Sequence, residues 1–213
     1  MTGPAVSGLE GRFGFTITVP DTWFELDVAP ATRDESIRRL VEERVRGHQE
    51  MWEARHGITR ILRDEARKAY DAGAAYAACM AMPTEDGAVT ASVVVSLVRG
   101  PVGATLEGDP VGSLVDRLVP VSPTDDGRFT SVTTVDLEHA GTAARSYGVE
   151  DVPVDAGYVR TVFMQTMVPV PRMNKVFLLS ASSPVVPLAA ELHDLFDAVT
   201  GTFRLVELEG ARG

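Results

Sequence analysis

The sequence predicts an α+β fold, a single antiparallel β-sheet of about six to eight strands with helices packed on its faces. Eight short segments either alternate apolar and polar residues or are continuously apolar, and turn residues separate them. Two other stretches, 33–72 and 188–199, repeat apolar residues at three- and four-residue steps, the spacing of amphipathic helices. The short connections between the later strand segments favour antiparallel neighbours.

The first two strands are predicted at 13–19 and 23–28, where a turn at Pro20-Asp21 makes them partners in a hairpin. A helical pair follows at about 33–72. Thr32 and Glu35 have the spacing of a capping box, and Gly57 is expected to break the pair into two helices.

The remaining elements complete the sheet. The segments 74–82 and 88–98 are predicted to form a hairpin, and Asp109-Pro110 opens a short helix to about residue 118. Four strands are then predicted at 129–137, 142–149, 158–168 and 173–180, before a Ser182-Ser183-Pro184 break and the helix at 188–199.

Length and composition are those of one globular domain. The chain has 213 residues, of which 45% are hydrophobic and 23% charged. We expect one domain over 12–208, with flexible segments at 1–11 and 209–213. Arginine outnumbers lysine 18 to 2, which suggests a bacterial protein.

Charge argues against several classes of partner. The net charge of −10 disfavours nucleic acid and anionic membranes. Residues 33–68 nevertheless hold ten basic and eight acidic side chains. A solvated helix face with ion pairs such as Asp34–Arg38 explains this mixture better than a phosphate-binding patch does.

Several features that the sequence lacks indicate where the protein is located and whether it binds a metal or cofactor. It has one cysteine, Cys79, no stretch of about 18 apolar residues and no secretory signal pattern, so we expect a cytoplasmic protein without membrane insertion. The four histidines show no metal-binding spacing, and we expect no metal and no cofactor.

A nucleophilic triad is the enzymatic alternative near the end of the chain. It would combine Ser182 or Ser183 with His193 and with Asp194 or Asp197, but no G-x-S-x-G motif supports it. We therefore expect no catalytic residues and no enzyme activity.

Two end motifs resemble the PsbP-like superfamily. The first is the strand that ends in Pro20 and is followed by Trp23; the second joins Phe177-Leu178-Leu179-Ser180 and Ser183-Pro184 to Phe196-Asp197-Ala198-Val199 and Thr202-Phe203-Arg204. The resemblance implies a sheet-and-helix fold used mainly for binding or assembly, and it transfers no functional residue.

We expect a non-catalytic binding or assembly module that contacts another protein. The candidate interaction surface is the helical pair, with Arg38, Arg39, Arg46 and Trp52 as its contact residues, because this pair departs most from the resembled pattern. The alternative is a small-ligand carrier or an enzyme with a pocket between sheet and helices. The sequence leaves the oligomeric state open.

Overall fold

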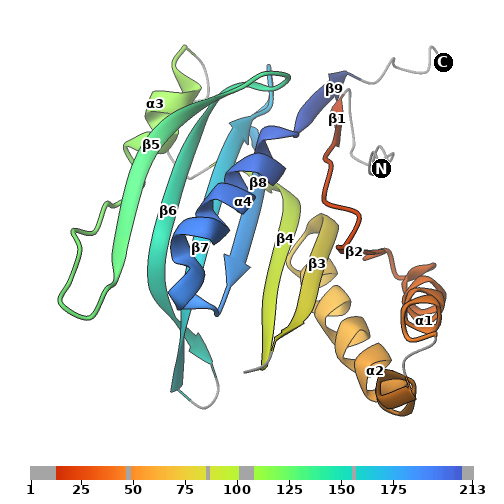
Figure 1. Ribbon diagram of the computed structural model, residues 1–213. Coiled ribbons are helices and arrows are strands. Elements are labelled where there is room, and N and C mark those ends of the chain that lie inside the picture. The colour runs from red at the N-terminus through yellow and green to blue at the C-terminus, as the bar shows by residue number, and fades with distance from the viewer. Residues whose placement is uncertain (1–12, 47–48, 85–86, 101–107, 155–156, 208–213) are drawn as a thin grey trace, which may run out of the picture.

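A computed structural model describes residues 13–46, 49–84, 87–100, 108–154 and 157–207 (Figure 1). Seven antiparallel strands form one sheet in the order β2-β3-β4-β8-β7-β6-β5. Their bounds are β2 Phe24–Leu26, β3 Ala74–Thr84, β4 Gly87–Arg99, β5 Phe129–Leu137, β6 Gly141–Val154, β7 Gly157–Pro169 and β8 Lys175–Ser183. The predicted fold class is confirmed.

A two-stranded ribbon and four helices complete the fold. The ribbon pairs β1 (Phe13–Thr16) with β9 (Arg204–Glu207). The helices are α1 (Arg33–Arg44), α2 (Gln49–Asp71), α3 (Pro110–Val115) and α4 (Ala189–Gly201), and a 3₁₀ turn η1 (Val186–Leu188) leads into α4.

One face of the sheet packs against α4, and we call it the α4 face (Figure 1). Leu192, Phe196 and Val199 of the helix are buried there, since their three- and four-residue spacing puts them on one side. Phe203 continues this core and stacks on Phe15, with ring centroids 5.6 Å apart. The core under α4 therefore joins the first and last strands of the chain.

The opposite face is covered in two places. The helical pair α1–α2 packs over β2 and β3, where Ile37, Val41 and Ala66 are buried. Helix α3 covers a separate area with Leu114 over Ala144. Asp109 caps α3 as predicted, because its Oδ1 accepts a hydrogen bond from Gly112 N at 2.8 Å.

Two hairpins extend beyond the rest of the sheet at one end. Strand β8 pairs with β4 over 92–99 and with β7 over 162–169, while β5 begins opposite Val149 of β6. The β3–β4 hairpin from about 80 to 91 and the β6–β7 hairpin from 150 to 161 pass this limit, as Figure 1 shows. We call them the β3–β4 arm and the β6–β7 arm.

Three local predictions are wrong. Strand β1 pairs with β9 and not with β2, because burial of Phe15 against Phe203 outweighs the short local hairpin. Helix α2 runs through Gly57, and the break between the helices falls after Arg44. The capping box does not form: Thr32 makes no side-chain capping bond and its N–H donates to Ala29 O, while the Glu35 carboxylate pairs with Arg38.

The expected domain ends fall outside this description. Residues 1–11 and 209–213, predicted to be flexible, lie outside the described residues.

Candidate functional site

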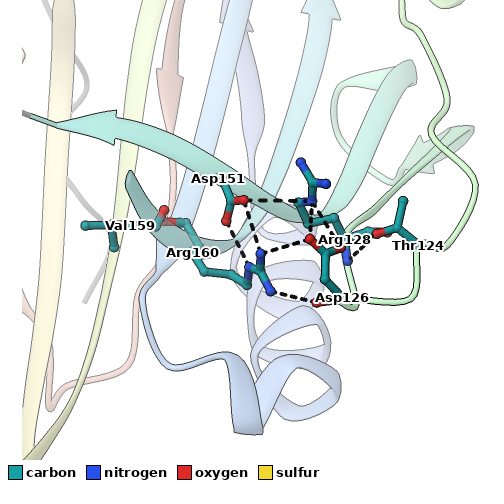
Figure 2. Close-up of polar contacts among 7 residues, drawn as sticks. Thr124, Asp126, Arg128, Asp151, Val159 and Arg160 are labelled. Atoms are coloured by element: carbon teal, nitrogen blue, oxygen red, sulfur yellow. Dashed lines mark hydrogen bonds and ion pairs between the residues drawn. The ribbon is translucent and has the colours of Figure 1, made fainter. Parts of the chain in front are cut away.

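Four charged side chains meet beside the β6–β7 arm (Figure 2). Arg160 donates from Nε to Asp151 Oδ1 at 2.8 Å and from Nη2 to Asp151 Oδ2 at 3.1 Å. Its Nη1 also donates to the backbone oxygen of Asp126 at 2.6 Å. Arg128 Nε binds the Asp126 carboxylate at 3.0 and 3.1 Å. The network joins the loop before β5 to both strands of the arm.

The loop itself is a closed turn over Thr124–Arg128. Thr124 Oγ1 donates to Asp126 Oδ1 at 2.5 Å, and Gly127 adopts φ 84°. The hydrogen bond from Thr124, followed by the bonds and charge of Arg128, lowers the pKa of Asp126. The hydrogen bond from Arg160 lowers the pKa of Asp151. Both carboxylates are therefore ionised at neutral pH.

The network matters because an isolated two-stranded hairpin is only marginally stable in water. Residues 150–161 have no third strand beside them in the described chain. Salt bridges that tie the arm to the Thr124–Arg128 turn restrict its motion relative to the sheet. These side chains are at least a quarter exposed, so their role is in positioning more than in overall stability.

Large apolar side chains on the two arms face solvent. Tyr158 is 74% exposed and Met82 is 55% exposed, and Val154 and Val159 are exposed as well. None of these residues is buried under α4 or the helical pair, so large parts of their side chains are open to solvent. An apolar group collected on positioned hairpins is a typical feature of an interaction surface.

A groove lies between Leu195 of α4 and the edge of the sheet formed by β2 and β3. Its volume is about 460 Å³, and its lining is mostly apolar. The lining residues are Pro20, Thr22, Trp23, Phe24, Met80, Ala81, Met82 and Leu195. Because Met82 belongs to both, the groove extends the exposed apolar surface of the arms.

A row of polar side chains crosses the opposite face of the sheet. Ser92 and Ser182 lie on neighbouring strands with their hydroxyl oxygens 3.2 Å apart. Gln165 lies between Ser180 and Ser146 in the strand register. These residues separate the area under the helical pair from the area under α3.

Arg145 is the one strongly buried charge in the described residues, with a side chain only 6% exposed. It donates to Asp197 of α4, to Thr166 Oγ1 at 3.0 Å and to Thr200 Oγ1 at 3.0 Å. All three partners belong to the packing of α4 on the sheet. Arg145 therefore fixes the helix and does not line an open site.

The predicted contact residues lie on the helical pair and are exposed. Arg38 forms ion pairs with Glu35 at 2.6 Å and with Glu42 at 3.2 Å. The predicted pair of Arg38 with Asp34 is therefore wrong. Arg39 and Arg46 are exposed in and just after α1. Trp52 carries the guanidinium of Arg55 over its ring, 4.4 Å from the centroid. Their role in binding stays a prediction.

The residues of the hypothetical nucleophilic triad form hydrogen bonds with other partners. Ser183 Oγ donates to Thr90 O at 2.6 Å, and Ser182 meets Ser92. His193 Nε2 lies 3.3 Å from Gly148 O, while Asp197 binds Arg145.

The described chain contains neither a cluster of potential metal ligands nor a helix suited to span a membrane. No group of three or more potential metal-ligating side chains occurs within it. None of its helices is both long enough and apolar enough to cross a membrane. His48, one of the four histidines considered for metal binding, lies outside the described residues.

Comparison with known proteins gives distant likenesses to solved structures. No family model and no curated protein matches the sequence. Among solved structures, the crystal structure of LpqN, involved in cell envelope biogenesis of Mycobacterium tuberculosis, is similar with a TM-score of 0.43 and 13% identity. The match covers 97% of this chain and 91% of that chain.

The predicted cytoplasmic location is corrected at this point. The similar solved structure is that of a protein involved in cell envelope biogenesis, and the cytoplasmic location is withdrawn. We assign no location to the chain.

Sequence reasoning predicted most of the β3–β4 arm and the β7 side of the β6–β7 arm, but it missed the extension of β6 over 150–154, the exposure of the arms and the ion pairs. The predicted strand at 142–149 stops before Asp151, because Val152-Pro153-Val154 gave no clear alternation. A usable signal was present: opposite charges at Asp151 and Arg160 become cross-strand neighbours once the two strands are extended into one hairpin.

Proposed function

We propose that this protein is a non-catalytic protein-binding module whose contact surface is the end of the sheet formed by the two arms. The observation that carries this proposal is the exposure of Tyr158 and Met82 on hairpins that project past the sheet. Tyrosine and methionine are enriched in protein interfaces, where burial by a partner would recover the exposed apolar area.

The ion-pair network also supports the arms as a contact surface. A partner that binds two mobile hairpins must pay the entropy of ordering them, which lowers affinity. Arg160 and Arg128 restrain the β6–β7 arm before any partner arrives. The surface is thus partly organised in advance.

Affinity capture from source cells tests this function with matched variants. The double substitution Tyr158→Ser and Met82→Ser should lose the captured partner. Val119→Ser is the control, because Val119 is 76% exposed and belongs to neither arm. Equal capture by the two variant proteins would contradict the arms as the contact surface.

The helical pair remains a second contact surface within the same function. Arg38, Arg39, Arg46 and Trp52 are all exposed, as a docking surface requires. Charge reversal at Arg39 and Arg46 should reduce capture if the pair takes part. If only the arm variant loses its partner, the helical pair is excluded.

A small-ligand carrier is the second candidate function, and the polar row on the opposite face favours it. Ser92, Ser180, Ser182 and Gln165 offer hydroxyl and amide groups on adjacent strands, suited to an uncharged polar ligand. A thermal-shift screen with a cell metabolite extract tests it. A stabilising fraction should lose its effect on Gln165→Leu.

The end motifs support a kinship with the PsbP-like superfamily as part of this proposal. Phe15 of the first motif stacks on Phe203 of the second, so both motifs serve one structural purpose. The kinship concerns the fold and carries no function of its own.

A further inference from the structure

Strand β8 stops five residues before the strands on both of its sides. Strand β4 continues from its last β8-paired residue, Ser92, through 91–87, and β7 continues from Val162 through 161–157. In the described chain these extensions pair only with β3 and β6. We call the position between 87–91 and 157–161 the β8 notch; Figure 1 shows the two arms passing the end of β8 on either side.

The register shows which backbone groups face the notch. In antiparallel strands, the N–H and C=O of alternate residues point to the same neighbour. Gly100 N donates to Asn174 O and Val170 N donates to Lys175 O, so even-numbered residues of β4 and β7 face β8. By this alternation, backbone groups of Thr90 and Ala88 face the notch from one side.

Arg160 and Tyr158 face it from the other side by the same alternation. The hydrogen bond from Ser183 Oγ to Thr90 O, at 2.6 Å, agrees with this assignment. There a side-chain hydroxyl supplies a bond that a longer β8 would supply from its backbone. The chain then turns away at Pro184, which has no N–H to continue the ladder.

We propose that the β8 notch binds an extended peptide segment of a partner protein, which continues the line of β8 and forms hydrogen bonds with β4 and β7 together. This inference rests on the proposed protein-binding function and specifies how the partner is recognised. Neighbouring strands lie about 4.8 Å apart, so a position flanked by strands on both sides accepts one extended chain and not a helix about 10 Å wide.

Side chains beside the notch indicate the chemistry of that segment. Tyr158 and Val159 project to opposite faces of the sheet, since successive residues of a strand alternate. Both are exposed. Continuing the register, a bound segment of about four residues places one side chain beside each of them. The fitting partner therefore has apolar side chains at neighbouring positions of an extended stretch.

Linear peptides displayed on phage are a suitable probe for this site. A library of unstructured peptides, each about twelve residues long, is selected against the full chain, and the enriched sequences are synthesised. Amide hydrogen exchange of the protein is then followed with and without each peptide. We expect new protection at Thr90, Arg160 and Tyr158, and enrichment of apolar, β-branched or aromatic residues in the peptides.

Two substitutions at one position separate backbone from side-chain recognition. Tyr158→Ala and Tyr158→Pro both remove the ring, and only proline removes the N–H that faces the notch. Because this N–H does not serve the β6 ladder, the arm keeps its pairing. We expect Tyr158→Pro to weaken peptide binding about fivefold more than Tyr158→Ala, the loss of about one hydrogen bond.

Each alternative outcome overturns the inference in a distinguishable way. Peptides that protect the helical pair instead would refute strand addition and leave a protein-binding function standing. Equal affinities for the proline and alanine variants would leave the arms as a contact surface without a backbone role. Protection of the notch that rises with protein concentration and needs no peptide would assign it to a second copy. If no peptide is enriched, the notch is not a peptide site.

Discussion

Replacing Asp197 by alanine should destabilise the protein more than removing its whole ion pair does. The substitution leaves the side chain of Arg145 buried under α4, where it is only 6% exposed. Among the described residues, its guanidinium then keeps hydrogen bonds to the Thr166 and Thr200 hydroxyls alone. Breaking a buried pair from one side costs about 3–5 kcal/mol in general. Asp197 is 62% exposed, so water can reach part of the vacated position. We therefore expect about 2 kcal/mol.

The double variant Arg145→Met with Asp197→Ala removes both charges. Methionine has a similar length and fills the channel between sheet and helix with apolar atoms. Thr200 keeps its hydrogen bond to Phe196 O at 2.7 Å, so its hydroxyl is still satisfied. Well-packed apolar residues often replace a buried pair at little cost, but the buried Thr166 hydroxyl loses its bond from Arg145, so we expect the double variant to be about 1 kcal/mol below the wild type.

Urea unfolding followed by tryptophan fluorescence measures both variants, since Trp23 is buried in the same core as α4. The midpoints are compared at constant m-value. A single variant within about 0.5 kcal/mol of the wild type would show that Arg145 is solvated in the folded state. A double variant less stable than Asp197→Ala would show that the pair is a net source of stability.

Three other predictions test separate parts of the fold. Gly148→Ala should lower the free energy of unfolding by about 1–3 kcal/mol, because the added Cβ would lie 1.9 Å from Phe129 O. Gly57→Ala should raise it by about 1 kcal/mol, because Gly57 lies within α2 and its added Cβ would meet no other atom. Urea titration of both variants checks the two signs. The lowered pKa values of Asp126 and Asp151 mean that the arm network contributes fully above the unfolded carboxyl pKa of about 3.9 and is lost only as pH falls through the lower pKa values of the folded state. Titration of the two carboxyl groups followed by NMR should therefore place both midpoints below about 3.9, and ordinary midpoints would reject this role. Burial raises the pKa of the Cys79 thiol to about 11, so little of it is thiolate at pH 8. Its alkylation at pH 8 should be at least about 100-fold slower than that of a free thiol. A rate similar to that of a free thiol would show that the Cys79 thiol is accessible.

Periodicity predicted the sheet well where strands are covered on a defined face. The strand at 129–137 was placed at its observed bounds, and the α4 helix was predicted within two residues of its ends. The apolar residues of α4 recur at three- and four-residue steps because one side of the helix meets the core. Strand β5 lies at the edge of the sheet, and β-branched residues after a turn identify it.

Pairing and exposure were harder to infer, for a physical reason. Phe15 could pair locally in a hairpin or distantly with β9, and only the assembled core of Phe15, Phe177 and Phe203 decides between them. The arms have the same composition as buried strands, since Val152 and Val159 are β-branched apolar residues in either setting. Whether a third strand covers them depends on where β8 ends, and that is a property of the whole sheet.

The pairing of β1 with β9 sets the order in which this protein can be completed during synthesis. Thr18 and Thr202 exchange hydrogen bonds through the Thr202 hydroxyl, at 2.8 and 3.1 Å, across 184 positions of sequence. A ribosome delivers residues from the N-terminal side, so Phe15 emerges early and its native cover is complete only when Phe177 and then Phe203 have followed. The strand made first is thus the last to be sealed, and the nascent chain carries an exposed aromatic segment through most of its translation.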